Sequence, residues 1–226
     1  MRVLLASRSP GRAAVLDRGE VDFVQVDPPF DDPPAADADL RGVEAAGGFA
    51  RSLAAQKLAS CDAAVLAAAG LDLPAGTWAV AADTVCVGAD GRALGKPETA
   101  DEAGAMLRGF VDAEHAVVTG LAIGRVRPGG GVAVETAWFE LATVAWGDID
   151  AIELGLYLVS GAWRGKSGGY NLTDRLEAGW PIEVTGDPDC VVGLPWRAVR
   201  QRVLNAAAAS PGPASRPQRP GALRAD

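Results

Sequence analysis

Histidine and cysteine are scarce in this chain of 226 residues, and their scarcity excludes several kinds of active site. His115 is the only histidine, so a metal site with several histidine ligands is excluded, and a Ser-His-Asp triad would depend on that single residue. The cysteines, Cys61, Cys86 and Cys190, are odd in number and lack paired spacing, which favours neither a disulfide framework nor a zinc motif. Cys86 lies in an apolar run and Cys190 just before another, so we expect both to be buried packing residues.

Long apolar runs and the common nucleotide-binding loops are absent as well. No run of eighteen apolar residues occurs, so the sequence predicts no membrane-spanning helix. The apolar stretch 1–6 is too short for a signal peptide and is interrupted by Ser7-Arg8-Ser9, and we therefore expect a cytoplasmic protein that does not contact membranes. No GxxxxGK(S/T) or GxGxxG loop follows an expected strand, which argues against a P-loop or a Rossmann site.

Lysine is rare in a chain that is rich in arginine and carries a net charge of −8. So acidic a protein is a poor non-specific binder of nucleic acid, and a polyanionic substrate must meet a local cluster of cations. Eighteen arginines accompany only three lysines, which suggests a bias toward arginine wherever either cation serves. Because lysine is a compact point charge that suits phosphate oxygens, Lys57, Lys96 and Lys166 are candidate phosphate ligands, although each is equally consistent with an ordinary surface cation.

The expected elements follow one another in a mixed α/β order, and the length permits one large domain or two small lobes around a cleft. Apolar runs and alternation predict strands over residues 3–6, 21–26, 78–87, 117–126 and 132–146, with a short strand near Ile182. Spacing and capping signals predict helices over residues 10–18, 44–61, 100–109 and 148–159 (capped by Asp148), a fragment after residue 63, and a last helix with Trp196, Val199 and Val203 on one face. Residues 1–205 are expected to form the folded domain, and the Ala/Pro/Arg-rich residues 206–226 a disordered tail.

The segment Ser7-Arg8-Ser9-Pro10-Gly11-Arg12 lies between an expected strand and an expected helix. Free backbone N–H groups at the helix start, two hydroxyls and the guanidinium of Arg12 together suit an anion. The same residues are consistent with simple N-capping by Ser9, which requires no ligand.

Asp83 is the most unusual residue of the chain, because it lies within the apolar run Ala81–Val85. A carboxylate there is costly to bury unless it is paired or binds a cation. It is either part of a structural hydrogen-bond network or a metal ligand at a cleft, and we favour the second. The turn Asp90-Gly91 predicts a hairpin that returns Lys96, in Leu94-Gly95-Lys96-Pro97, toward Asp83.

Two further segments carry residues suited to phosphate or metal chemistry. The glycine-rich loop Lys166–Tyr170 contains both a lysine and an aromatic ring. The pair Asp31-Asp32 lies in an expected loop and would supply a second hard oxygen ligand to a divalent cation, although a solvated turn is the simpler interpretation of that pair taken alone.

Taken in order, these segments resemble the Maf proteins over roughly residues 2–204. The resemblance rests on Ser-x-Ser-Pro-x-Arg at 7–12, the helical Lys57, Ala-Asp-Thr-Val at 82–85, Gly-Lys-Pro at 95–97, Lys-x-Gly-x-Tyr at 166–170 and Val-Val-Gly-Leu-Pro at 191–195. It implies an α/β, mixed-sheet, two-lobed Maf/ITPase-like fold with a central cleft. It also implies hydrolysis of a nucleoside triphosphate to a nucleoside monophosphate and pyrophosphate, with Mg²⁺ or Mn²⁺ as cofactor, and it is consistent with a homodimer.

Carried over position by position, the resemblance assigns roles to ten residues. It implies catalytic roles for Asp83, Lys96, Lys57 and Arg12, substrate binding by Ser7, Ser9, Arg12, Thr84, Lys166 and Tyr170, and metal binding by Asp83 and Asp32. The position of Asp32 is usually glutamate in the family. These roles agree with the charges, since a triphosphate carries about four negative charges that Arg12, Lys57 and Lys96 offset, and carboxylates suit Mg²⁺.

The chain departs from the family pattern at positions that bear on the base of the substrate. The family often has an arginine pair where this chain has Gly11-Arg12. Members that prefer dTTP and UTP commonly read Gly-Ile-Gln-Gly after the motif tyrosine, where this chain reads Asn171-Leu172-Thr173-Asp174. Features typical of members that prefer 7-methyl-GTP are absent, and Ala-Asp-Thr leans toward dTTP and UTP. A 7-methyl-GTP pyrophosphatase and a non-catalytic, nucleotide-binding regulator of cell division remain the alternatives.

Overall fold

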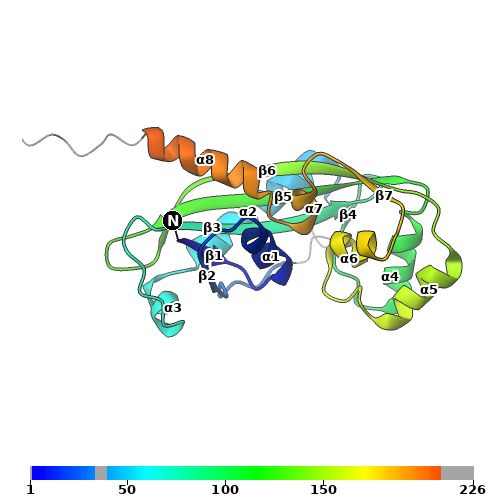
Figure 1. Ribbon diagram of the computed structural model, residues 1–226, viewed down its shortest axis with the longest axis horizontal. Coiled ribbons are helices and arrows are strands. Elements are labelled where there is room, and N and C mark those ends of the chain that lie inside the picture. Colours follow the sequence, from blue (N-terminus) through cyan, green and yellow to red (C-terminus); the bar gives the residue numbers. More distant parts are fainter. Residues whose placement is uncertain (1, 34–39, 210–226) are drawn as a thin grey trace, which may run out of the picture.

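A seven-stranded mixed sheet runs through the length of the molecule (Figure 1). The computed structural model describes residues 2–33 and 40–209, and within them the strand order is β2-β1-β3-β5-β6-β7, with the short β4 paired to β3. β1 pairs in parallel with β2 and β3, and the remaining pairs are antiparallel. The strands are β1 (Val3–Ala6), β2 (Phe23–Val26), β3 (Trp78–Val87), β4 (Ala93–Leu94), β5 (Glu114–Val126), β6 (Val132–Trp146) and β7 (Ile182–Thr185).

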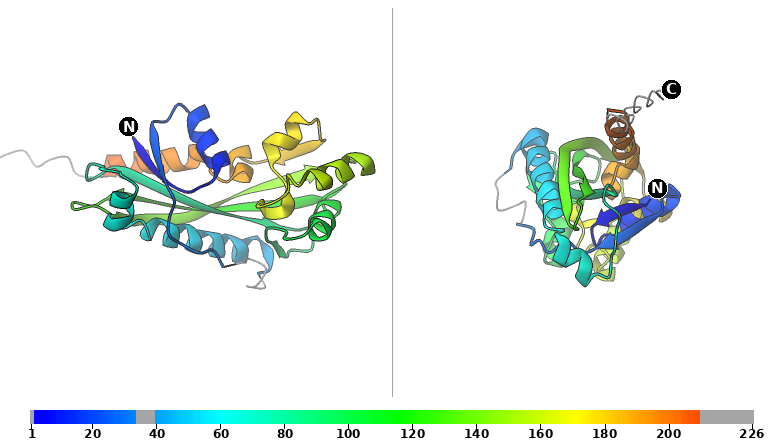
Figure 2. Two further views of the ribbon diagram at one scale, coloured as in Figure 1. Left: turned by 90° about the horizontal axis from the view of Figure 1, so that it is seen from below. Right: turned by 90° about the vertical axis from the view of Figure 1, so that its left-hand side faces the viewer.

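Helices cover both faces of this sheet and form two lobes at its ends. They are α1 (Pro10–Arg18), α2 (Gly42–Ala59), α3 (Ala63–Ala68), α4 (Ala100–Arg108), α5 (Ala151–Ser160), α6 (Leu172–Glu177), α7 (Pro188–Val192) and α8 (Trp196–Ala209), with a 3₁₀ turn, η2, at Ser167–Gly169. α2 lies along one face, whereas α1 and α6 lie over the other (Figure 2). One lobe holds β1, β2, α1 and α3, and the other holds α4, α5, α6 and β7 (Figure 1). The two-lobed α/β architecture expected from the sequence is therefore confirmed.

α2 approaches the sheet closely because its buried side is made of small residues. Ala46, Ala50 and Ala54, spaced four residues apart on one face of the helix, are fully buried. Leu53 and Leu58 fill the space beside them. This packing fixes the last turn of α2, which carries Lys57, against β3.

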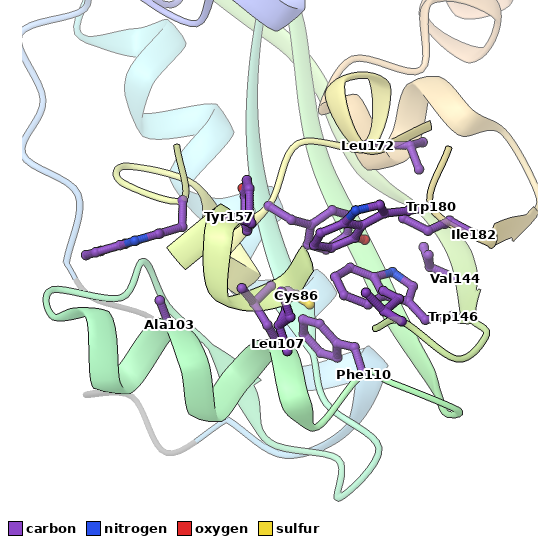
Figure 3. Packing of buried hydrophobic residues seen from close by; sticks show 14 of the residues in the cluster. Cys86, Ala103, Leu107, Phe110, Val144, Trp146, Tyr157, Leu172, Trp180 and Ile182 are labelled. Atoms are coloured by element: carbon purple, nitrogen blue, oxygen red, sulfur yellow. The ribbon is translucent and has the colours of Figure 1, made fainter. Parts of the chain in front are cut away.

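The second lobe is built around an aromatic core, shown in Figure 3. Trp146 lies at its centre, with edge-on ring contacts to Tyr170 at 5.0 Å and to Trp180 at 5.2 Å between centroids. Such pairs contribute about 1 kcal/mol each beyond the burial of their surface. Tyr157 also donates a hydrogen bond to the carbonyl of Gly169 at 3.0 Å. The core thus holds the loop around Gly169 and Tyr170 in a fixed position.

Most of the predicted elements are present, with some corrections. The helix predicted from Asp148 begins instead after Asp150, whose carboxylate accepts hydrogen bonds from the N–H groups of Ile152 and Glu153. Ile149 is buried, so the chain has to enter the core before the helix starts. The helices α6 and α7 were not predicted, because each spans at most six residues and has no readable periodicity. The expected burial of Cys86 and Cys190 is confirmed.

The predicted C-terminal tail lies largely outside the described residues, and α8 runs to Ala209, into its first residues. Among the residues that the structure describes, no helix is both long and apolar enough to cross a membrane.

Candidate active site

A cleft of about 470 Å³ lies between the two lobes. Segments far apart in the chain line it: the start of α1, the loop at residues 27–32, the end of α2, the middle of β3 and the loop that contains η2. It brings together all ten residues that the sequence proposed for the site, namely Ser7, Ser9, Arg12, Asp32, Lys57, Asp83, Thr84, Lys96, Lys166 and Tyr170.

A gap in the pairing of β3 opens this cleft. β1 pairs with β3 as far as Val80, and β4 begins to pair only at Cys86. Within the described residues, positions 81–85 of β3 pair with β5 alone. Successive side chains of a strand point to opposite faces of the sheet, so Asp83 and Thr84 face opposite ways. Because the strand edge is uncovered between β1 and β4, both residues still line the same cleft.

Arg12 is held by a separate hydrogen bond from each nitrogen of its guanidinium. Nε donates to the carbonyl of Gly193 at 2.9 Å, Nη1 to Ser7 Oγ at 3.1 Å, and Nη2 to Thr84 Oγ1 at 3.3 Å. Gly193 has φ +105°, which brings it so close to Thr84 that a Cβ would lie 2.8 Å from the hydroxyl. Only glycine fits this turn, and it ties α7 to the Arg12 side of the cleft.

The hydroxyl of Thr84 links Arg12 to the core through a directed chain of hydrogen bonds. Thr119 Oγ1 donates to the carbonyl of Cys190 at 2.7 Å, so its contact with Thr84 Oγ1 at 3.0 Å has to be accepted by Thr119. Thr84 therefore donates to Thr119 and accepts from Arg12. Each hydroxyl makes one donation and one acceptance, which fixes the position of the guanidinium.

Ser7 and Ser9 organise the start of α1. Ser9 caps the helix by accepting from the N–H of Arg12 at 3.3 Å, as the capping interpretation predicted. Ser7 is buried, and its Oγ accepts from Ser9 N at 3.2 Å and from Arg12. Since both of these bonds use its lone pairs, the O–H of Ser7 remains as a donor for a ligand in the cleft.

Lys57 lies between two carboxylates. Its Nζ is 2.6 Å from Oδ1 of Asp83 and 2.8 Å from Oδ1 of Asp32. Lys57 and Asp83 are 7% and 8% exposed, whereas the side chain of Asp32 is 35% exposed. Asp83, whose carboxylate is costly to bury in an apolar strand, is thus paired with Lys57. Asp32 reaches the same lysine from the loop before residue 34.

The remaining predicted residues, Lys96, Lys166 and Tyr170, also line the cleft. The hairpin predicted from the Asp90-Gly91 turn is present as the β3–β4 pair, and Lys96, which follows it, is exposed and lines the same cleft as Asp83. Lys166 lines the cleft, but its ammonium donates to the carbonyl of Ala162. Tyr170 lines the cleft but is buried, and its hydroxyl contacts Nε2 of His115 at 2.8 Å in the core.

The sequence arguments gave no role to several polar or charged lining residues, among them Arg164 and Asn171. Arg164 is an exposed cation whose guanidinium lies 4.3 Å from the ring centre of Trp163, and Asn171 caps α6 through Oδ1, 3.2 Å from the N–H of Asp174. Both flank the Lys166–Tyr170 motif, and that adjacency was the available signal. Arg164 adds a further positive charge to the cleft.

Burial and two nearby carboxylates shift the pKa of Arg12 in opposite directions. Removal from water lowers the pKa of its guanidinium, and the nearby charges of Asp83 and Asp32 raise it. Arginine titrates so far above neutrality that Arg12 remains a cation. The cleft therefore presents the cations Arg12, Lys57 and Lys96 beside the carboxylates of Asp83 and Asp32.

The donor set suits a hard divalent cation that also takes ligands from a substrate. Among the described residues, no group of three or more His, Cys, Asp or Glu side chains is placed to hold an ion. Asp83 and Asp32, however, both contact one cationic atom, which demonstrates that the pair can share a single cation. Mg²⁺ is typically held by one or two carboxylates together with phosphate oxygens and water, and this pair meets that requirement.

Comparison with known proteins identifies the family. Residues 2–206 match the family model described as Maf-like protein. A dTTP/UTP pyrophosphatase of Salinibacter ruber is 38% identical over 196 residues, 86% of each chain. One of Methylobacillus flagellatus is 36% identical over 213 residues, 93% of this chain and 96% of the relative. A third, of Thermomicrobium roseum, is 36% identical over 206 residues, 89% and 84% of the two chains.

Among solved structures, a nucleoside-triphosphatase / dITP/XTP pyrophosphatase of Mycobacterium abscessus is 18% identical. The match covers 67% of this chain and 76% of that chain, with a TM-score of 0.31. The family match over almost the whole described chain and the similarity to full-length relatives confirm the resemblance stated from the motifs. The chain belongs to the Maf family.

Proposed function

We propose that this protein hydrolyses nucleoside triphosphates to nucleoside monophosphates and pyrophosphate. The observation that carries the proposal is the joining, in one cleft, of three cations with a pair of carboxylates that share a cation. The three cations offset the negative charge of a triphosphate, and the two carboxylates would bind its Mg²⁺ or Mn²⁺. The relatives named dTTP/UTP pyrophosphatases support the same reaction.

The residues of the cleft have separate roles in the proposed hydrolysis. Arg12, held in place by three bonds, and the O–H of Ser7 bind phosphate oxygens beside the start of α1. Lys96 and Lys57 offset further negative charge as it shifts between the oxygens during the reaction. Asp83 accepts a hydrogen bond from the attacking water and so directs it toward the α-phosphate. The divalent cation, held by Asp83 and Asp32, would supply charge neutralisation at the phosphates.

We propose dTTP and UTP as the preferred substrates. The relatives support this choice, as does the Ala-Asp-Thr sequence around Asp83. The loop after Tyr170 differs from that of the dTTP/UTP group, so 7-methyl-GTP is the alternative to include in any test. A non-catalytic regulator is disfavoured, because the chain retains Arg12, Lys57, Asp83 and Lys96 in one cleft.

The proposal includes a cytoplasmic location and a homodimer. The dimer is tested by light scattering on the purified full chain, where a mass twice that of the chain is expected. A monomer at the concentrations used for catalysis would contradict it.

A substrate panel tests the reaction. Purified protein is incubated with Mg²⁺ or Mn²⁺ and each canonical nucleoside triphosphate, dTTP and 7-methyl-GTP, and pyrophosphate and inorganic phosphate are measured separately. We expect pyrophosphate, released fastest from dTTP and UTP. Release of inorganic phosphate alone would refute the cleavage position, and no release from any triphosphate would refute the enzyme.

A further inference from the structure

Lys57 lies between the two carboxylates that are proposed to hold the divalent cation. Its Nζ is within 2.8 Å of both Asp83 and Asp32, although these residues come from a strand and a loop that are far apart in the chain. The ammonium is almost fully buried, so little water screens it. A dication cannot enter the same space without displacing the ammonium, because two cations at that distance repel and Oδ1 of each carboxylate is already paired with Nζ.

We propose that Lys57 takes the place of the metal in the free protein. Its ammonium holds Asp83 and Asp32 together before substrate binds, and it moves from these carboxylates to the phosphate oxygens when a nucleoside triphosphate enters the cleft. The inference rests on the proposed function, since it requires that a polyanion enters the cleft. It implies that metal and nucleotide bind cooperatively, with Lys57 as the coupling residue.

The surroundings of Lys57 permit such an exchange of partners. The residue lies in the last turn of α2, which ends at Ala59, and its ammonium is carried on a flexible stem of four carbons. Asp32 lies in a loop without regular structure and is partly exposed. The ammonium can therefore move toward a phosphate without disturbing the packed side of α2, where Ala50 and Ala54 are fixed.

Leaving the carboxylates without any cation would be costly, which explains why the substitute is needed. Asp83 is 8% exposed in an apolar strand, and an unpaired charge there is strongly destabilising. A lysine that pairs with both Asp83 and Asp32 compensates the buried charge and holds the two carboxylates close together. The site is thus preorganised for a cation while remaining closed to the metal alone.

The test is a titration of Mn²⁺ into the protein, monitored by the electron spin resonance of free Mn²⁺, without and with a non-hydrolysable α,β-methylene analogue of dTTP. For the wild type we expect weak binding of Mn²⁺ alone and binding about tenfold or more tighter when the analogue is present, after correction for Mn²⁺ bound by free analogue. For Lys57→Met we expect Mn²⁺ alone to bind about tenfold more tightly than to the wild type, with a smaller gain from the analogue. Lys57→Arg, which keeps the positive charge, is the matched control and should keep the weak binding.

Either of two results overturns the proposal. One is a wild type that binds Mn²⁺ equally well with and without the analogue, a measurement that needs no variant. The other is a folded Lys57→Met, verified by its thermal transition, that binds Mn²⁺ no more tightly than the wild type. Because the titration involves no turnover, its failure is distinguishable from that of the proposed function, which the release of pyrophosphate decides separately.

Discussion

Gly120 of β5 lies against the backbone of Ala50 in α2, with no side chain between them. A Cβ placed on Gly120 would be 2.1 Å from the carbonyl carbon of Ala50, far inside any allowed contact. Helix and strand can meet this closely only because one residue is glycine and the other is alanine. Two turns further along, the same helix carries Lys57 to Asp83, so this contact sets the position of a candidate catalytic residue.

Gly120→Ala is expected to destabilise the protein by about 3 kcal/mol or more, because α2 has to move away from the sheet to admit the methyl group. Thermal or urea unfolding measures this change. Gly48→Ala is the matched control: Gly48 lies in the same helix, and a Cβ there meets nothing within 4 Å. We expect that variant to be more stable than the wild type by about 1 kcal/mol, since alanine is the better helix former. Equal effects of the two substitutions would show that the contact with Ala50 is unimportant.

Thr84→Val removes the hydroxyl that accepts from Arg12 and donates to Thr119 while keeping the shape of the side chain. Arg12 then loses one of its three fixed partners, and we expect KM for the nucleotide to rise about tenfold, the typical effect of a lost hydrogen bond to a charged group. Steady-state kinetics with dTTP measures it. Thr84→Ser keeps the hydroxyl and should behave nearly as the wild type; a loss as large as that of the valine variant would argue against the hydrogen-bond chain.

His115 predicts a pH dependence of stability. The residue is buried, stacked on Phe110 with ring centres 3.9 Å apart, and burial lowers its pKa from 6.5 to about 4. Between these values the unfolded state binds more protons than the folded state. The neutral imidazole therefore stabilises the fold fully above pH 6.5, and this contribution, about 3 kcal/mol, is lost as the pH falls toward 4.

The effect of His115 is isolated by comparing the wild type with His115→Gln, which cannot titrate in this range. Free energies of unfolding are measured from pH 7 to pH 4 for both proteins. The difference between them should narrow as the pH falls, because only the wild type has a histidine to protonate. A constant difference across the range would exclude His115 as the cause.

Asp83→Asn tests the role of the carboxylate in the apolar strand. The amide oxygen of asparagine still accepts from Lys57, and Asp32 still pairs with that lysine, so we expect the fold to persist. Turnover should fall by about a hundredfold or more, because the group that orients the water is lost. Asp101→Asn, at an exposed carboxylate of α4 outside the cleft, is the control and should be unaffected. An active Asp83→Asn would remove Asp83 from its proposed role.

The features that could be predicted from the sequence depend on residues that are close together in the chain. Ser9 reads as a helix cap because the cap and its helix are neighbours, and Lys96 could be placed because the Asp90-Gly91 turn fixes a short hairpin. The long strands were recognisable from their apolar runs, and α6 and α7 were too short to be recognised.

Contacts between distant segments explain what could not be predicted. The gap between β1 and β4 that exposes the edge of β3 depends on where two separate strands end. The position of Lys57 between Asp83 and Asp32 depends on how α2 packs, and no spacing in the sequence encodes it. The motif predicts that Tyr170 binds a ligand, but it gives no sign that the hydroxyl of Tyr170 contacts His115 in the core.

Hydrolysis in water enriched in oxygen-18 reports which phosphorus of the triphosphate is attacked in this cleft. The full chain is incubated with dTTP and Mg²⁺ in labelled water, and the products are analysed by mass spectrometry. If water attacks the α-phosphate, as we propose, the nucleoside monophosphate will carry one labelled oxygen and the pyrophosphate none. Label in the pyrophosphate, with an unlabelled monophosphate, would place the attack at the β-phosphate and contradict the account.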